Sequence, residues 1–251
     1  MAADWPQWGG TDSRNLVSPE KNLPTGFDPQ KGRAGDDANV RWVRKIGNAA
    51  YGNPKHYRFR KGKEIPYYEG DKRKRWSTNK HDGKFVGPSQ IIGTPVLYKN
   101  SVYVAIGQDP MHGRGKGMLH CVDPTGKGDI TKNGCVWTYD GLDRSMATVS
   151  IAGGLLYVSD VAGRLHCLDA DTGKIRWVCE THTETWGGAL LADGKAYMCT
   201  KKYLYVFAQG AEVKLLSKIR LGSAIYSTPI AANRTLYVAS QRELWAASIK
   251  P

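Results

Sequence analysis

The sequence predicts an all-β protein, and more narrowly a β-propeller built of four-stranded antiparallel blades. Three observations lead to this prediction. Gly is 29 of 251 residues, and the chain also carries 13 Tyr and 8 Trp, a composition that suits many short strands joined by tight turns. A pattern of strands and turns recurs about every 40 residues. Finally, the last copy of that pattern is cut short, and the missing strand stands near the N-terminus.

The repeat is anchored by a Tyr in each copy, with spacings of 54, 40 and 40 residues: Tyr103, Tyr157, Tyr197 and Tyr237. Eight residues before each Tyr, an innermost strand begins at Pro95, Val149, Ala189 and Pro229. A Trp stands 12 residues before two of these positions, Trp137 before Val149 and Trp177 before Ala189. Trp42 stands 12 residues before Pro54, which also resembles the start of an innermost strand. A period near 40 with four strands per unit is typical of propeller blades, which bury their faces against one another.

Within one copy, "LHCLDADTGKIRW" (165–177) shows how the strands are joined. Residues 165–168 alternate as a half-buried strand does, 169–174 have turn chemistry, and the next strand carries Trp177. Gly173 is free to adopt a positive φ in this turn.

We therefore divide the chain into an N-terminal extension, 1–38, and a propeller, 39–251. The blades are expected at about 91–140, 147–180, 187–220 and 227–249. The orphan Trp42 strand, 39–47, should pair with the truncated last copy and close the ring, which removes an exposed edge. The irregular basic segment 55–90 lies between Pro54 and Pro95, which are one repeat length apart, and is a degenerate fifth repeat, a long loop or the scar of lost blades.

Charge and Cys content limit the function classes. The net charge is +13, and residues 55–84 hold 11 Lys or Arg against 4 acids, which indicates a solvated loop or an anion-binding patch. No nucleic-acid-binding signature accompanies it. The five Cys form no C-x-x-C pair, so zinc ribbons and redox motifs are unsupported, and we expect buried apolar Cys. The chain shows neither a transmembrane run nor a signal peptide, although "AAD" at 2–4 resembles the residue pattern after a cleavage site.

The stretches "DADTGKIRW", "TPIAANRTLYVAS" and "DWPQWGG" resemble the PQQ-like (pyrroloquinoline quinone-like) β-propeller repeat proteins, a superfamily with quinoprotein alcohol dehydrogenase-like and BamB-like members. The resemblance implies a periplasmic or secreted protein. It also implies that the side chains of Trp42, Trp137 and Trp177 dock between neighbouring blades, and that the turn at Gly173 orients Trp177. It also makes PQQ and calcium candidate cofactors. However, this chain lacks the adjacent Cys pair of the catalytic members, and no motif places calcium ligands.

The residues three positions before each innermost strand are all large: Tyr51, Ile92, Met146, Trp186 and Tyr226. Because the innermost strands line the central channel, these side chains should meet at one mouth of it. There they either form a platform for a sugar, a quinone or a peptide, or fill the channel as core.

Other candidate residues carry weaker signals. Asp109 and His112 could share a metal ion, or belong to a polar turn. His182 and Glu184 could act as an acid/base pair beside Trp186, and Asp143 and Arg144 suggest an ion pair.

Together these features favour a non-catalytic binding or scaffold module outside the cytoplasm, which presents loops and a channel mouth to a protein, a glycan or a small ligand. The alternatives are a quinone-dependent alcohol or sugar dehydrogenase, and a propeller remnant that has lost blades. An incomplete ring would favour self-association.

Overall fold

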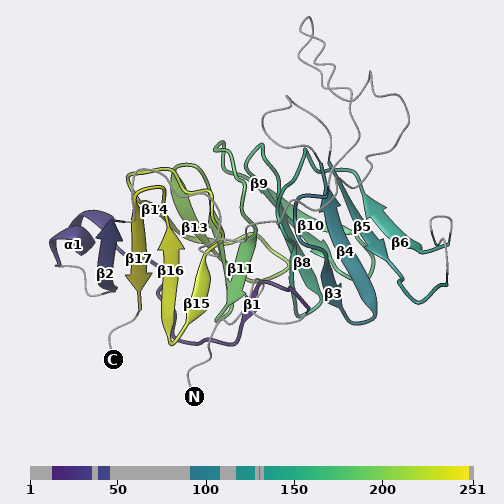
Figure 1. The fold of residues 1–251 in the computed structure, drawn as a ribbon, viewed down its shortest axis with the longest axis horizontal. Helices are drawn as coiled ribbons and strands as arrows, with labels where there is room; N and C mark the ends of the chain where they lie inside the picture. Colours follow the sequence, from purple (N-terminus) through teal and green to yellow (C-terminus); the bar gives the residue numbers. More distant parts are fainter. Residues whose placement is uncertain are drawn as a thin grey trace, which may run out of the picture.

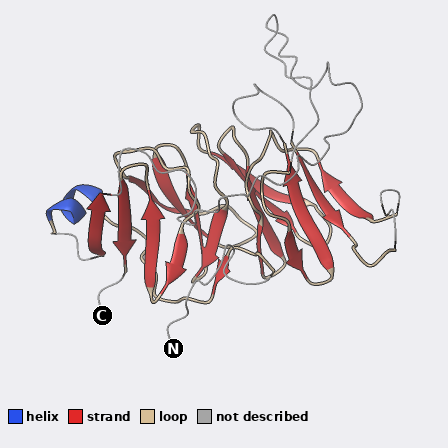
Figure 2. Ribbon diagram, viewed as in Figure 1, coloured by secondary structure: helices blue, strands red, loops and turns tan. Residues whose placement is uncertain are grey.

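The computed structural model describes residues 13–35, 39–45, 91–107, 117–127, 130 and 133–248. Within these ranges the regular secondary structure is β-strand, apart from one short helix, α1 (Pro29–Ala34) (Figure 2). The strands form four antiparallel units of four strands each, and each unit coincides with one copy of the sequence repeat. The predicted fold class, an all-β protein of propeller-like blades, is therefore confirmed.

The four sheets are numbered as blades in chain order. Blade 1 contains β3 (Val96–Tyr98), β4 (Ser101–Ile106), β5 (Met118–Val122) and β6 (Cys135–Tyr139), and blade 2 contains β7 (Ser150–Ala152), β8 (Leu155–Ser159), β9 (Arg164–Asp169) and β10 (Ile175–Glu180). Blade 3 contains β11 (Ala189–Ala192), β12 (Lys195–Cys199), β13 (Tyr203–Ala208) and β14 (Leu215–Arg220), with β1 (Val17–Ser18) added beside β11. Blade 4 contains β15 (Ile230–Ala232), β16 (Thr235–Ala239), β17 (Glu243–Ala247) and β2 (Val40–Lys45).

The N-terminal strand completes the last blade, as the sequence predicts. β2 pairs antiparallel with β17, with Trp42 opposite Ala246 and Val43 opposite Trp245. The blades stand side by side in a row, and blade 4 and blade 1 lie at its opposite ends (Figure 1). Closure of a full ring therefore stays a prediction, because the described residues bring no partner to either end blade's outer side.

The turns between the first two strands of each blade explain why the repeat keeps its length. In blade 3, Asp193 and Gly194 have φ angles of 51° and 68°, and in blade 4 Asn233 and Arg234 have φ angles of 53° and 55°. Two consecutive positive φ values are the geometry of a type I′ turn, whose twist matches that of the flanking strands. Such two-residue turns fix the hairpin register, which fixes the eight-residue offset between the innermost strand and the Tyr.

In blades 1 and 2 the repeated Tyr fastens the blade to its next neighbour along the chain, whereas the Tyr197 hydroxyl of blade 3 donates to Pro24 O in the N-terminal segment at 3.2 Å. Tyr103 of blade 1 and Tyr157 of blade 2 are fully buried, and the Tyr103 hydroxyl donates to the carbonyl oxygen of Ala170 in the next blade at 3.1 Å. The Tyr157 hydroxyl accepts from the backbone N–H of Gly210 in blade 3 at 2.9 Å. A buried hydroxyl needs a partner, and here the partner lies across the interface, so the Tyr specifies the stacking of neighbours.

The repeated Trp acts at the same interfaces. The indole N–H of Trp137 donates to Ala170 O at 3.1 Å, and that of Trp177 donates to Gly210 O at 3.0 Å, each 33 residues along the chain. Gly173, at φ 69°, has a further role that the sequence did not indicate: a Cβ there would lie 2.6 Å from the Trp137 ring. Besides forming the turn before Trp177, Gly173 thus makes room for the Trp of the preceding blade.

The N-terminal segment 13–25, called here the strap, crosses all four blades. Its carbonyl at Ser13 accepts from Leu97 N of blade 1, and the Asn15 side chain exchanges two hydrogen bonds with the backbone of Ile151 in blade 2. β1 pairs parallel with β11 of blade 3, and the Ser18 hydroxyl donates to Ala231 O of blade 4. The strap therefore ties the row of blades together along one side.

The end of the strap and the residues that follow it fill the gap between blades 3 and 4. Leu23 and Phe27 are buried in the core cluster between these blades, and Phe27 stacks on Trp245 with ring centroids 5.6 Å apart. The third repeat has no Trp on its outer strand. The N-terminal segment thus supplies apolar side chains to the interface between blades 3 and 4, which lacks the repeated Trp.

Candidate functional site

A cavity of the described residues lies where four loops meet, each leading into the innermost strand of one blade. It is a pocket of about 230 Å³. The lining residues occupy equivalent positions of the repeat: 92–94 from blade 1, Met146 and Thr148 from blade 2, 186–188 from blade 3 and 226–228 from blade 4. Four of the five side chains predicted for the channel mouth, Ile92, Met146, Trp186 and Tyr226, are thereby brought together. The fifth, Tyr51, lies outside the described residues.

The walls of this pocket are backbone segments in close contact. Gly188 N donates to Thr228 Oγ1 at 2.9 Å, and at the equivalent position two blades earlier Thr94 N donates to Thr148 Oγ1 at 3.0 Å. A Cβ at Gly188 would lie 2.5 Å from the carbonyl oxygen of Thr148, so only Gly allows this approach. Loops held in this way form a preorganised pocket, which lowers the entropic cost of binding a ligand.

One side of the pocket is aromatic. The rings of Trp186 and Tyr226 have centroids 4.3 Å apart and planes inclined at 42°. The indole N–H of Trp186 donates to Glu184 Oε1 at 2.5 Å, and Glu184 also accepts from Lys201 Nζ at 3.2 Å. The hydrogen bond to Glu184 raises the pKa of Lys201. Because Glu184 satisfies the indole N–H, the orientation of the Trp186 ring is fixed.

The chemistry of the lining points to binding. It combines aromatic and aliphatic side chains with the hydroxyls of Thr and Ser, and none of the lining residues is an acid, a base or a Cys. Such a set can stack against a ring and form neutral hydrogen bonds. Among the lining residues, Tyr226 carries the one titratable side chain of a type that takes part in general acid–base chemistry.

The other candidate residues lie apart from this pocket lining. His182, whose side chain is 81% exposed, has Nδ1 3.5 Å from Glu180 Oε1, whereas Glu184 is occupied by Trp186 and Lys201. The structure thus gives His182 and Glu184 separate partners instead of pairing them. Asp143 forms its ion pair with Arg164, at 3.2 Å, although the sequence suggested Arg144.

The metal candidates Asp109 and His112 fall outside the described residues. Within the described ranges, no group of three or more His, Cys, Asp or Glu side chains is placed to hold a metal ion. All five Cys are described and unpaired; Cys121, Cys167 and Cys199 are buried as expected, but Cys135 is exposed.

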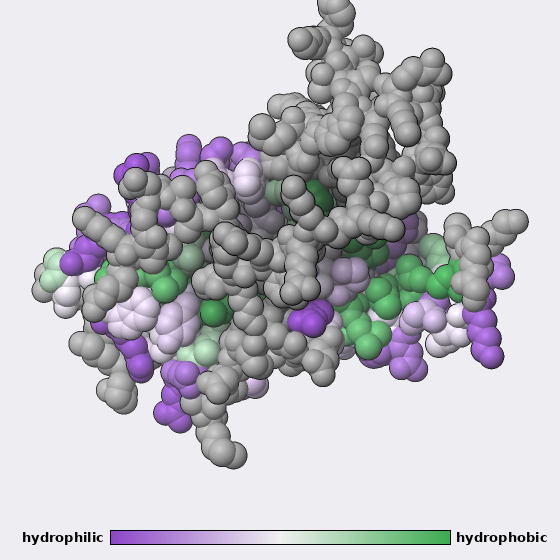
Figure 3. All heavy atoms as spheres, in the orientation of Figure 1, coloured by the Kyte–Doolittle hydropathy of each residue, from purple (hydrophilic) through white to green (hydrophobic). Residues whose placement is uncertain are grey.

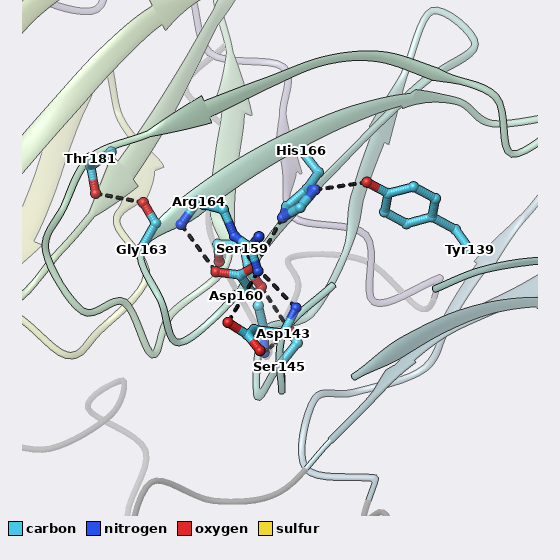
Figure 4. Close-up of polar contacts among 10 residues, drawn as sticks. Tyr139, Asp143, Ser145, Ser159, Asp160, Gly163, Arg164, His166 and Thr181 are labelled. Atoms are coloured by element: carbon cyan, nitrogen blue, oxygen red, sulfur yellow. Dashed lines mark hydrogen bonds and ion pairs between the residues drawn. The ribbon is translucent and has the colours of Figure 1, made fainter. Parts of the chain in front are cut away.

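A buried polar network between blades 1 and 2 was not foreseen from the sequence (Figure 4). The carboxylate of Asp160, whose side chain is 0% exposed, accepts from Arg164 Nη2 at 2.7 Å, His166 Nε2 at 3.0 Å and Asp143 N at 3.2 Å. Because a carboxylate can only accept, the Nε2 of His166 carries a proton and donates to Asp160, and Nδ1 of the same ring is hydrogen-bonded to the Tyr139 hydroxyl of blade 1 at 3.1 Å.

The electrostatics of Asp160 favour its charged form. Desolvation by burial pushes the pKa of Asp160 upward, but hydrogen bonds from His166 and Arg164 outweigh it, so the pKa falls below its ordinary value. The equivalent positions in blades 3 and 4 are Thr200 and Ser240, whose hydroxyls accept from the backbone in the same turn. An acid in place of a hydroxyl at this repeat position is the sequence signal that could have revealed the network.

The family model described as outer membrane protein assembly factor BamB, of the PQQ-like repeat class, matches residues 69–178 and 115–209, which together exceed half of the chain. No curated protein matches the sequence significantly.

Three solved structures illustrate the likeness in fold. BamB from Moraxella catarrhalis is 15% identical over 63% of this chain and 44% of its own, with a TM-score of 0.48. A quinohemoprotein alcohol dehydrogenase from Pseudomonas putida HK5 is 14% identical over 95% of this chain and 34% of its own, with a TM-score of 0.45. A europium-containing methanol dehydrogenase is 12% identical over 85% of this chain and 31% of its own, with a TM-score of 0.40. The chain thus spans less than half the length of each.

Proposed function

Since the chain belongs to the BamB-like family of PQQ-like repeat proteins, we propose that it is a non-catalytic binding module that acts outside the cytoplasm. The observation that carries the proposal is the pocket at the channel mouth, where equivalent loops of four blades converge. Repetition explains its rigidity, because each wall is held by the blade beside it.

The pocket favours a ligand with a ring that can stack. Trp186 and Tyr226 supply the aromatic face of the pocket. Thr94, Thr148 and Thr228 also line it, and the hydroxyls of Thr148 and Thr228 each accept a hydrogen bond from a backbone N–H. A sugar ring of a glycan, or another small uncharged ring, matches an aromatic surface bordered by neutral hydrogen-bonding groups.

Intrinsic fluorescence tests this proposal directly. We expect a soluble oligosaccharide panel to change the tryptophan emission of the protein and to protect it from acrylamide quenching. The change should disappear in Trp186→Phe and persist in Trp137→Phe, the matched control whose indole is bonded to Ala170 away from the pocket. A response that is identical in the two variants would mean that the pocket is not the binding site.

The second candidate is a quinone-dependent dehydrogenase, and the described residues do not fit its cofactor. The quinone carries three carboxylates, but the lining of the pocket includes no Lys or Arg. Calcium takes six to eight oxygen ligands, and no suitable cluster lies within the described part of the chain. An absorbance titration with PQQ and calcium would expose any binding; a shifted quinone spectrum would revive this candidate.

The location outside the cytoplasm is supported by the family description, which names an outer membrane protein assembly factor. No helix in the described ranges has the length and hydropathy to cross a bilayer. Fractionation of cells that express the natural gene, followed by detection of this protein, is the test; recovery with the cytoplasmic fraction would contradict the assignment.

A further inference from the structure

The three interfaces between blades obey one rule. The repeated Tyr of each blade shares a core cluster with the residue that comes directly after the Tyr in the next blade. The pairs are Tyr103 with Val158, Tyr157 with Met198 and Tyr197 with Val238, and all six side chains are buried. Each blade therefore has a front face, which presents its Tyr, and a back face, which presents the residue after the Tyr.

The two ends of the row carry one half of this interface each. Tyr237 on the front face of blade 4 is only half-buried, unlike its three equivalents. Trp42 lies beside it, with ring centroids 6.1 Å apart, and is also half-buried, whereas Trp177 on the same strand of blade 2 is 8% exposed. The Tyr and Trp that fasten other blades to a neighbour thus stand at the end of blade 4 with no described blade in front of them.

The back face of blade 1 is the complementary half. Val102, Val104 and Val122 are half-buried there, but their equivalents in blade 2, Leu156, Val158 and Leu168, are 0% exposed because blade 1 covers them. Leu97 at the same end is 49% exposed. Hydrophobic surface is visible over the β3–β5 end of the row (Figure 3).

We propose that these two ends bind a second copy of this chain, so that two arcs of four blades close into one ring. Blade 4 of each copy would pack on blade 1 of the other, and Tyr237 of one copy would contact Val104 of the other by the rule of the internal interfaces. The two contacts are related by a two-fold axis, which makes the assembly closed. The four described blades of two copies make eight together, within the usual range of four to eight.

A second copy is the occupant that matches both faces at once. An unrelated protein would need a separate surface for each end, but the chain already contains the front half and the back half of the same interface. Burying them removes exposed apolar side chains at both ends of the row, which is the driving force for obligate homodimers.

The mass of the full chain in solution tests the assembly. Light scattering coupled to size exclusion should give twice the 27.7 kDa of one chain, independent of dilution in the micromolar range. A monomer at every concentration, or a mass above two copies, would overturn the proposal. A monomeric protein that loses stability on Tyr237→Lys would show that the chain covers its own end faces, which also overturns it.

Paired variants test the head-to-tail geometry. Tyr237→Lys and Val104→Glu should each yield a folded monomer, because each places a charge in both copies of the contact. Mixed in equal amounts, they should recover the double mass, since one contact is then native and the other joins Lys to Glu. This recovery needs two folded partners, so it cannot arise from misfolding.

Val178→Glu is the matched control. Val178 lies on the outer strand β10 of blade 2, is 43% exposed, and takes no part in the proposed contact. This variant should keep the double mass. Dissociation of the control to the same extent, or a mixture of the two end variants that stays monomeric, would refute the proposed interface.

Discussion

Replacement of Asp160 by Asn should destabilise the protein strongly, because it removes the one charge that the network between blades 1 and 2 is built around. Asp160 Oδ2 accepts from four N–H groups, of Asp143, of His166 and twice of Arg164, and Oδ1 accepts from Arg164 N. An Asn side chain has a single acceptor oxygen, so its amide N–H₂ must face a donor on one side or the other.

The magnitude follows from burial. Leaving a buried donor unpaired costs about 1–3 kcal/mol, and breaking a buried charged pair costs about 3–5 kcal/mol. Asp160 is 0% exposed, but the Arg164 side chain is 28% exposed, so water compensates part of the loss. We expect Asp160→Asn to lower the free energy of unfolding by about 3 kcal/mol, which corresponds to a fall in Tm of about 6–12 °C for a domain of this size.

The dependence on pH gives the prediction its signature. Because the folded pKa of Asp160 lies below its ordinary value of 3.8, the charged carboxylate stabilises the fold above that value, and this contribution is lost as the pH falls through the folded pKa. Urea denaturation monitored by tryptophan emission should therefore show the full difference between the wild type and Asp160→Asn at pH 7. The difference should shrink below about pH 4.

The control is Asp171→Asn, which also removes a charge that joins blades 1 and 2. Its partner is Lys99 at 2.8 Å, and the Lys99 and Asp171 side chains are 58% and 57% exposed, so water screens the pair and the loss should be much smaller than that of Asp160→Asn. Equal effects of the two substitutions, or a difference for Asp160→Asn that does not change with pH, would refute the assignment of Asp160 as the buried charge of the network.

Three further predictions concern the packing of the blades. Trp177→Ala should lower the free energy of unfolding by about 3–5 kcal/mol, and a loss below about 1 kcal/mol in urea denaturation would contradict the inter-blade contact of this ring. Gly188→Ala should destabilise the protein, because the new Cβ would lie 2.5 Å from a carbonyl oxygen of blade 2. Gly210→Ala is the control and should be tolerated, because the nearest atom to its Cβ would be 3.9 Å away. Similar melting temperatures of the two variants would disprove the close approach at Gly188. In a thiol-labelling time course followed by mass spectrometry, the exposed Cys135 should react first. Cys199 should react only on unfolding, because complete burial raises the pKa of its thiol. Early labelling of Cys199 would show that blade 3 opens in the native state.

The repeat could be predicted from the sequence because its causes are local. Alternation along a strand and the two-residue turns fix the distance from each innermost strand to its Tyr, so equal offsets place Tyr103, Tyr157 and Tyr197 at equivalent heights. The same reasoning brought Ile92, Met146, Trp186 and Tyr226 to one pocket, and it paired the N-terminal strand with the truncated last repeat.

Contacts without periodicity were decided only by the tertiary structure. Asn15 reaches Ile151, 136 residues away, through a strap whose sequence shares nothing with the repeat. Asp160 stands at an ordinary turn position, and it becomes the centre of a network only because stacking brings Tyr139 of the neighbouring blade against His166. The stacking direction also determines that Gly173 receives the ring of Trp137. Local patterns specify what one blade looks like, but the partner of a side chain across an interface depends on how the blades are packed, and that is set by the whole chain.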